Sequence, residues 1–93
     1  MSKLIMGKFK DNNIELCRTT SMRAGDKTAA LLLEKQIPFV KASKKIPFFR
    51  REEYHGAEQI YVISINPHRY GQARRVLDTL EIPYRKNLML SNY

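Results

Sequence analysis

The chain has 93 residues, with 17 lysines and arginines against 9 aspartates and glutamates, which gives a formal net charge of +8. This length suits one small hydrophobic core, so we expect a single domain over residues 1–93 and exclude a two-domain protein. The positive charge excludes an acidic binding protein and indicates anionic partners. A lone cysteine, Cys17, excludes a disulfide-stapled secreted protein and favours the reducing cytoplasm.

The N-terminal residues contain one short apolar run, Leu4-Ile5-Met6, before charged residues resume. This run is too short for a signal-peptide core or a membrane span, so we expect a cytoplasmic protein without a membrane partner. The polar residues 10–13 that follow predict a turn. Apolar residues on both sides of this turn predict a hairpin, with an extra N-terminal strand.

Residues 14–20 have the alternation and the β-branched ends that are typical of a strand. The alternation predicts Ile14 and Leu16 on one face of this strand. Glu15 and Cys17 are then expected on the opposite face.

A helix is predicted next, from Ser21 to Gln36, because the segment is rich in strong helix formers and begins with residues that can cap it. Ile37-Pro38 ends this helix, since the residue before a proline is disfavoured in the helical conformation. Residues 39–42 then resume an extended pattern.

Residues 43–58 follow neither the helical nor the strand period, so we expect a long loop. Residues 59–65, QIYVISI, give the strongest strand signal and are apolar enough to lie at the centre of a sheet. Asn66-Pro67 then marks the start of a second helix, as the N-cap and the first-turn proline.

The second helix shows an apolar stripe that should face the sheet, formed by Ala73, Val76, Leu77 and Leu80. We expect Ile82-Pro83 to end this helix in the same way that Ile37-Pro38 ends the first. Residues 84–90 are then predicted to form the last strand.

The two halves of the chain correspond at a spacing of 45 residues, which aligns Gln36-Ile-Pro-Phe39 with Glu81-Ile-Pro-Tyr84. Each half, residues 13–42 and residues 59–90, has the pattern strand-helix-strand. With right-handed crossovers, two such units predict an α+β ferredoxin-like βαββαβ sandwich, an antiparallel sheet with two helices on one face. The alternative is coincidence, because Ile-Pro can mark the end of any helix that precedes an edge strand.

The apolar helix ends and strands carry a resemblance to a known family, in residues 31–33, 35–39, 60–65 and 76–84. In these segments the chain resembles a family of small bacterial proteins of unknown function, described as signal-transducing proteins. The resemblance implies a ferredoxin-like fold and no catalytic residues. This chain has Gln36 and Glu81 where that family has glycine before Ile-Pro.

The sequence contains no recognised catalytic or cofactor-binding motif, so we expect no enzymatic activity and no cofactor. His55, His68 and Cys17 fall in separate segments, and none has a second ligand at metal-binding spacing. Gly25-Asp-Lys-Thr28 resembles only the end of a phosphate-binding loop, and we interpret it as the first turn of a helix.

Basic residues are the strongest functional signal, and they fall into one group around two phenylalanines and a second group near the second helix. Cations can follow phosphates and aromatic rings can stack on bases, so we predict charge-led binding of nucleic acid or another polyanion with little sequence specificity. The predicted binding residues are Lys41, Lys44, Lys45, Phe48, Arg50, Arg51, Arg69, Arg74, Arg75 and Arg85. Against this, Glu52, Glu53 and Glu58 would neutralise part of the charge, and Phe48-Phe49 could instead plug the core.

The alternative function is a signal-transducing or protein-interaction module that regulates a protein partner. Residues 39–42 or 88–90 could then form an open sheet edge for a homodimer. Tyr54, Tyr61 or Tyr93 could anchor such a contact.

Overall fold

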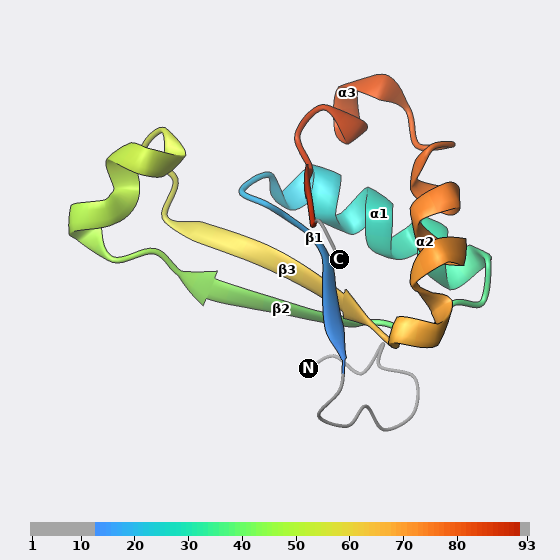
Figure 1. The fold of residues 1–93 in the computed structure, drawn as a ribbon. Coiled ribbons are helices and arrows are strands. Elements are labelled where there is room, and N and C mark those ends of the chain that lie inside the picture. The colour runs from blue at the N-terminus through green and yellow to red at the C-terminus, as the bar shows by residue number, and fades with distance from the viewer. Residues whose placement is uncertain (1–12, 92–93) are drawn as a thin grey trace.

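A computed structural model describes residues 13–91 of the chain, which form a four-stranded antiparallel sheet and its helices (Figure 1). The strand order is β2-β3-β1-β4. The strands are β1 (Ile14–Thr19), β2 (Val40–Lys45), β3 (Gln59–Ile65) and β4 (Met89–Leu90). The helices are α1 (Met22–Glu34), α2 (Tyr70–Leu77) and α3 (Ile82–Arg85), together with the 3-10 helices η1 (Phe48–Tyr54) and η2 (Pro67–Arg69).

The coarse α+β prediction is confirmed, and β1, α1 and β3 lie where the sequence places them. The predicted N-terminal hairpin and extra strand fall in residues 1–12, outside the described residues. Among the helices of residues 13–91, none is both long enough and apolar enough to cross a bilayer.

Strand β1 contains a bulge that changes which side chains share a face. Its pairing with β3 shifts register between Glu15 and Cys17, so Leu16 is the extra residue. Leu16 and Cys17 are both fully buried. The predicted placement of these two residues on opposite faces is therefore wrong, because the bulge interrupts the alternation.

The same bulge brings Glu15 and Arg18 to one face of β1. In a regular strand, residues three positions apart point to opposite faces. Here Glu15 pairs with Ser64 and Arg18 pairs with Val62, and these partners are two residues apart on β3. Glu15 and Arg18 therefore point the same way.

Helix α1 begins at the predicted cap, where the Ser21 hydroxyl accepts a hydrogen bond of 3.1 Å from the Ala24 N–H. Its first turn lies directly over β1 and β3, since a Cβ built on Gly25 would be 3.6 Å from Thr19 and 3.7 Å from Tyr61. Tyr61 therefore lies beneath α1, on the covered face of the sheet.

Helix α1 ends in a Schellman motif, two residues earlier than the sequence predicts. The Ile37 N–H donates to the Leu32 carbonyl at 2.9 Å, and the Gln36 N–H donates to the Leu33 carbonyl at 3.0 Å. Gln36 has a φ of 60°, the left-handed conformation that favours glycine. This turn sends Ile37 into the core, where it is buried.

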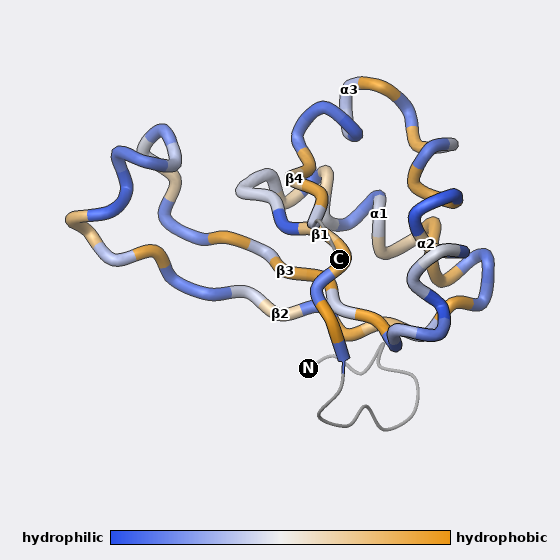
Figure 2. The backbone as a smooth tube through the Cα atoms, viewed as in Figure 1, coloured by the Kyte–Doolittle hydropathy of each residue, from blue (hydrophilic) through white to orange (hydrophobic). Residues whose placement is uncertain are grey.

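The segment predicted as a long loop, residues 43–58, is instead an ordered projection. Strand β2 continues to Lys45, which pairs with Gln59, and η1 closes the hairpin. We call residues 43–60 the arm, and Figure 1 shows it extending away from the helices. The sequence missed it because β2 is exposed from Ala42 to Lys45 and so lacks an apolar period. Figure 2 shows hydrophilic residues along most of the arm and a short hydrophobic stretch at its outer end.

The second helix starts as predicted, but α2 ends at Leu77, before the predicted stop at Ile82-Pro83. Val76 of the predicted stripe is half-buried. The Asn66 side chain accepts a hydrogen bond of 2.8 Å from the His68 N–H, and Pro67 occupies the first turn, which is the 3-10 helix η2. Ala73, Leu77 and Leu80 are buried.

The prediction of a strand over residues 84–90 is wrong for most of its length. Ile82–Arg85 forms the short helix α3, with Pro83 in its first turn, and β4 comprises only Met89–Leu90. Proline accounts for the error, because its fixed φ suits both an extended segment and the first turn of a helix.

The buried hydroxyl of Thr19 links the end of β1 to the segment before β4. It donates a hydrogen bond of 2.6 Å to the Asn87 carbonyl and accepts one of 3.0 Å from the Ser21 N–H. Thr19 is 1% exposed, so both bonds are shielded from water.

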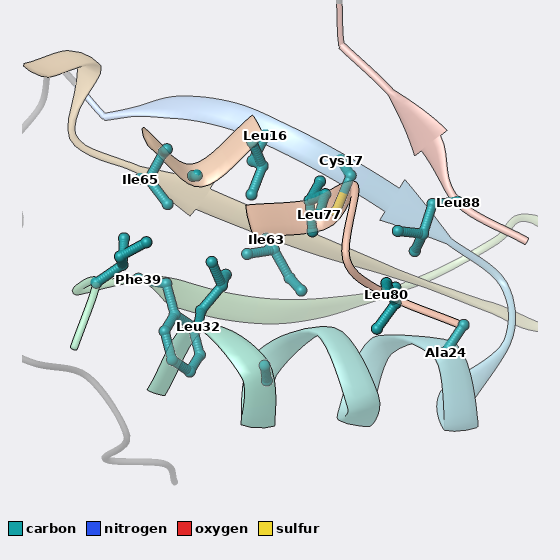
Figure 3. Close-up of a cluster of buried hydrophobic side chains, with 13 residues drawn as sticks. Leu16, Cys17, Ala24, Leu32, Phe39, Ile63, Ile65, Leu77, Leu80 and Leu88 are labelled. Carbon is teal, nitrogen blue, oxygen red and sulfur yellow. The ribbon is translucent and has the colours of Figure 1, made fainter. Parts of the chain in front are cut away.

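The hydrophobic core lies between one face of the sheet and the helices α1 and α2 (Figure 3). Its buried members come from β1, β3, both helices and the connections between them: Leu16, Cys17, Ala24, Ala29, Leu32, Ile37, Phe39, Ile63, Ile65, Ala73, Leu77, Leu80 and Leu88. The register places Glu15, Arg18, Lys44 and Ile60 on the other face of the sheet. That face, where the arm begins, is where the candidate site lies.

Candidate nucleic-acid interface

A concave site of about 210 Å³ lies where the arm leaves the sheet. Three separate segments form it: β1, the end of β2 with η1, and the start of β3. We call it the basic groove, and its lining residues are Arg18, Lys44, Lys45, Ile46, Pro47, Arg50, Tyr54 and Ile60. Four cations and a tyrosine therefore surround an apolar floor.

Arg18 is held in the basic groove by a two-point contact with Glu15. Its Nε lies 2.7 Å from Glu15 Oε2, and its Nη2 lies 2.6 Å from Glu15 Oε1. The hydrogen bond from Arg18 holds the pKa of Glu15 below its ordinary value, against the opposing effect of burial. The contact orients the guanidinium and neutralises part of its charge.

Lys44 and Lys45 supply the least compensated charge in the groove. Both are exposed, and in residues 13–91 neither has a carboxylate within salt-bridge distance. Lys44 is near enough to Glu15 to contribute to the lowered pKa of that carboxyl group. Both ammonium groups can therefore meet an anion from solution.

The arginines of η1 have different roles. Arg50 is exposed and pairs with Glu53 at 3.1 Å, a contact that water screens. Arg51 is half-buried and donates from Nε to the Ile46 carbonyl at 3.2 Å, which fastens η1 to the end of β2. The Arg51 guanidinium also lies 5.8 Å from the centre of the Phe48 ring.

The two phenylalanines of η1 do not plug the core. Phe48 and Phe49 are each 81% exposed, so that alternative from the sequence is wrong.

Lys41 lies outside the basic groove. It is on the helix-covered face of β2, where its Nζ forms a salt bridge with Asp26 of α1 and lies 5.9 Å from the centre of the Tyr61 ring. Its charge is compensated, and it helps to hold α1 against the sheet.

The second predicted group of arginines lies away from the arm. Figure 1 shows α2 and α3 at the opposite end of the molecule, so the structure does not bring the two groups into one surface. Three of these arginines donate to backbone carbonyls: Arg69 to Gln36 at 3.4 Å, Arg74 to Ser91 at 3.2 Å and Arg85 to Asp78 at 3.0 Å. Arg75 is exposed on α2. We assign the first three to holding the helices in place.

Two groove residues escaped the sequence analysis, Arg18 and Tyr54. Arg18 stands alone among uncharged residues after Glu15, so no cluster marked it. Tyr54 was considered only as an anchor for a protein contact. The bulge in β1 and the fold of η1 bring them together, and neither feature leaves a sequence pattern.

The cysteine and the two histidines lie apart from one another in the described residues. Burial raises the pKa of the Cys17 thiol to about 12, so it stays protonated at neutral pH. His55 and His68 are exposed and lie at opposite ends of the fold, on the arm and before α2. In residues 13–91, no group of histidine, cysteine and acidic side chains could hold a metal ion.

Comparison of the chain with protein-family models, with curated proteins and with solved structures gave no match.

Proposed function

We propose that this chain is a ferredoxin-like domain that binds nucleic acid through the basic groove and performs no catalysis. The fold part of the proposal is supported by the strand order, which read from the other edge is β4-β1-β3-β2. That order, with α1 after β1 and α2 after β3, is what two interleaved βαβ units produce. The resemblance to the signal-transducing family is compatible with the same fold.

The observation that carries the functional part is that four basic residues line one concave site, with Arg18 and Lys44 on the same open face of the sheet. Phosphates are the anions that such a site suits, because arginine and lysine donate several hydrogen bonds to phosphate oxygens. The cations of the groove would contact the phosphates of the nucleic-acid backbone, and few of its side chains could recognise base edges. Binding should therefore have low sequence specificity. Glutamates at positions 52, 53 and 58 limit the positive field of the arm, so we expect few phosphates to be bound.

Salt dependence tests this proposal. If Lys44, Lys45 and Arg50 each neutralise one phosphate while Glu15 compensates Arg18, the logarithm of the affinity for a single strand should fall with the logarithm of salt with a slope of about −2. The probe is a fluorescently labelled random-sequence oligonucleotide, titrated with the full chain at several salt concentrations. Failure to bind at low salt would reject the proposal.

Charge reversal locates the site. The double variant Lys44→Glu with Lys45→Glu should abolish binding, because it places two negative charges in the groove. The matched control, Arg75→Glu with Lys86→Glu, makes the same change of net charge at exposed positions near α2 and α3. Equal losses from both variants would show that net charge acts without a site.

The alternative, a homodimer or partner contact through a sheet edge, has weaker support. The free edge of β2 carries Lys44 and Lys45, and lysines on an edge strand oppose pairing with another strand. The other edge, β4, is two residues long. A dimer that persists in the Lys44→Glu, Lys45→Glu variant would favour this alternative.

A further inference from the structure

The outer end of the arm carries two adjacent aromatic side chains in contact with solvent. Phe48 and Phe49 are each 81% exposed, the highest values among the large hydrophobic residues described. Exposure of each ring to water is unfavourable, and a ligand that covered a ring would recover this free energy.

The arm holds these rings in a fixed frame. The Ile46 N–H donates to the Glu58 carbonyl at 2.9 Å, and the Arg50 N–H donates to the Pro47 carbonyl at 2.9 Å. The Gly56 N–H closes the far end of η1 by donating to the Arg51 carbonyl at 2.7 Å. A ligand therefore meets a backbone that already holds both rings at the end of the arm, which reduces the entropy lost on binding.

The periodicity of η1 gives the two rings different neighbours. In a 3-10 helix, side chains three positions apart lie on one face. Phe48 therefore shares a face with Arg51 and Tyr54, and the Arg51 guanidinium lies 5.8 Å from the Phe48 ring. Tyr54 is at the end of this face and lines the basic groove. We call Phe48, Arg51 and Tyr54 the stacking row.

Phe49 lies on a different face of the same helix. Its neighbour three positions on is Glu52. A carboxylate beside the ring is unfavourable for a polyanion. The two phenylalanines are thus the same residue type and equally exposed. They differ in the side chains that lie on their own face of η1.

We infer that the ligand is a single-stranded nucleic acid, whose bases stack along the stacking row while its phosphates lie in the basic groove. This inference rests on the proposed function and specifies its substrate. Aromatic rings and guanidinium planes stack on bases, and a row that ends in a cationic groove matches the alternation of bases and phosphates in one strand. A duplex keeps its base faces stacked on each other and cannot offer them.

The probes are an oligothymidylate of about twelve nucleotides, a DNA duplex and an abasic oligonucleotide of the same length, and inorganic polyphosphate. Phe48→Ala should weaken binding of the oligothymidylate about tenfold, the typical loss for one stacked base. It should leave binding of the abasic strand and of polyphosphate unchanged. Phe49→Ala is the matched control and should have a clearly smaller effect.

Fluorescence gives a second readout, because the chain contains no tryptophan. In the variant Phe48→Trp, the new indole should be quenched by the oligothymidylate and not by the abasic strand. Thermal unfolding should be unchanged in each variant, since both rings are exposed.

The outcomes separate the two proposals. If all polyanions bind alike and Phe48→Ala changes nothing, base stacking on the stacking row is rejected and phosphate binding in the basic groove is retained. The exposed ring would then serve another class of partner, such as a protein. Equal losses from Phe48→Ala and Phe49→Ala, or a duplex bound as tightly as the single strand, would also overturn the row. If no polyanion binds at low salt, both proposals fail.

Discussion

Replacing Gln36 by glycine should stabilise the protein. Gln36 has a φ of 60° at the end of α1, where its N–H and that of Ile37 complete the Schellman motif. A residue with a Cβ is strained in this conformation and glycine is not. The Gln36 side chain is exposed, and the contact that Arg69 makes here is to the backbone carbonyl, so Gln36→Gly removes strain without removing that contact.

The expected gain is the difference between two terms. Relief of left-handed strain is worth about 1–2 kcal/mol. The larger conformational entropy of glycine in the unfolded chain reduces this stabilisation by about 0.5–1 kcal/mol. The middle of both ranges gives a net gain of about 0.75 kcal/mol, which raises Tm by about 3–6 °C in a domain of this size.

Thermal and urea denaturation, followed by circular dichroism, measure this gain. The matched control is Lys35→Gly one position earlier, where φ is −88° and glycine relieves nothing, so the variant should lose stability. Gln36→Ala keeps the Cβ and should show no gain. A Tm for Gln36→Gly at or below that of the original chain would refute the strain argument.

Three further outcomes follow from buried or paired groups. Thr19→Val should lower the free energy of unfolding, measured by urea denaturation, by about 1–3 kcal/mol. Valine has nearly the same volume but makes neither hydrogen bond of the buried hydroxyl. An unchanged free energy of unfolding would contradict this. Because burial raises the pKa of Cys17 from 9.0 to about 12, the neutral thiol favours folding below pH 9, and this contribution should be lost as pH rises from 9 toward 12. The Cys17→Ala variant should lose less stability over that range, and an identical pH profile would disprove the assignment. Glu15→Gln should release Arg18 in the groove and make the slope of log affinity against log salt steeper by about 0.7. The control Glu34→Gln, at an exposed position on α1, should leave the slope unchanged. Equal changes in both variants would show that net charge alone acts.

The core of the fold was predictable because apolar periodicity reports burial directly. The stripe of α2 faces the same core as Ile63 and Ile65 of β3. The spacing of 45 residues aligns Leu32 of α1 with Leu77 of α2, and both are buried. These signals depend on residues that a helix or strand must bury whatever surrounds it.

The correspondence between the halves ends after the helices. Ile37 is 1% exposed, whereas its counterpart Ile82 is 60% exposed at the start of α3. The Ile-Pro pair permits both outcomes, because proline fits an extended segment and a first helical turn equally. The preceding residue differs: Gln36 is left-handed, and Glu81 is extended and precedes a helix. Neither side chain reveals that difference in the sequence.

The candidate site was predictable only where its residues cluster in the chain. Lys44 and Lys45 were found because they are adjacent. Arg18 was not, since regular alternation from Leu16 would direct it into the core, and one extra residue in β1 sends it to the open face instead. Arg69 and Arg74 were included among the predicted binding residues because the sequence does not show that their guanidinium groups donate hydrogen bonds to backbone carbonyls.

The arm projects past the helices, so its internal hydrogen bonds are mostly local. It should therefore open independently of the core, with amide protons in η1 exchanging with solvent much sooner than those in the middle of β3. Such a hairpin extension can be lengthened, shortened or exchanged for another sequence while the helices and the central strands keep their packing. The same scaffold could thus acquire a new ligand by replacement of fewer than twenty residues, those from Ser43 to Ile60.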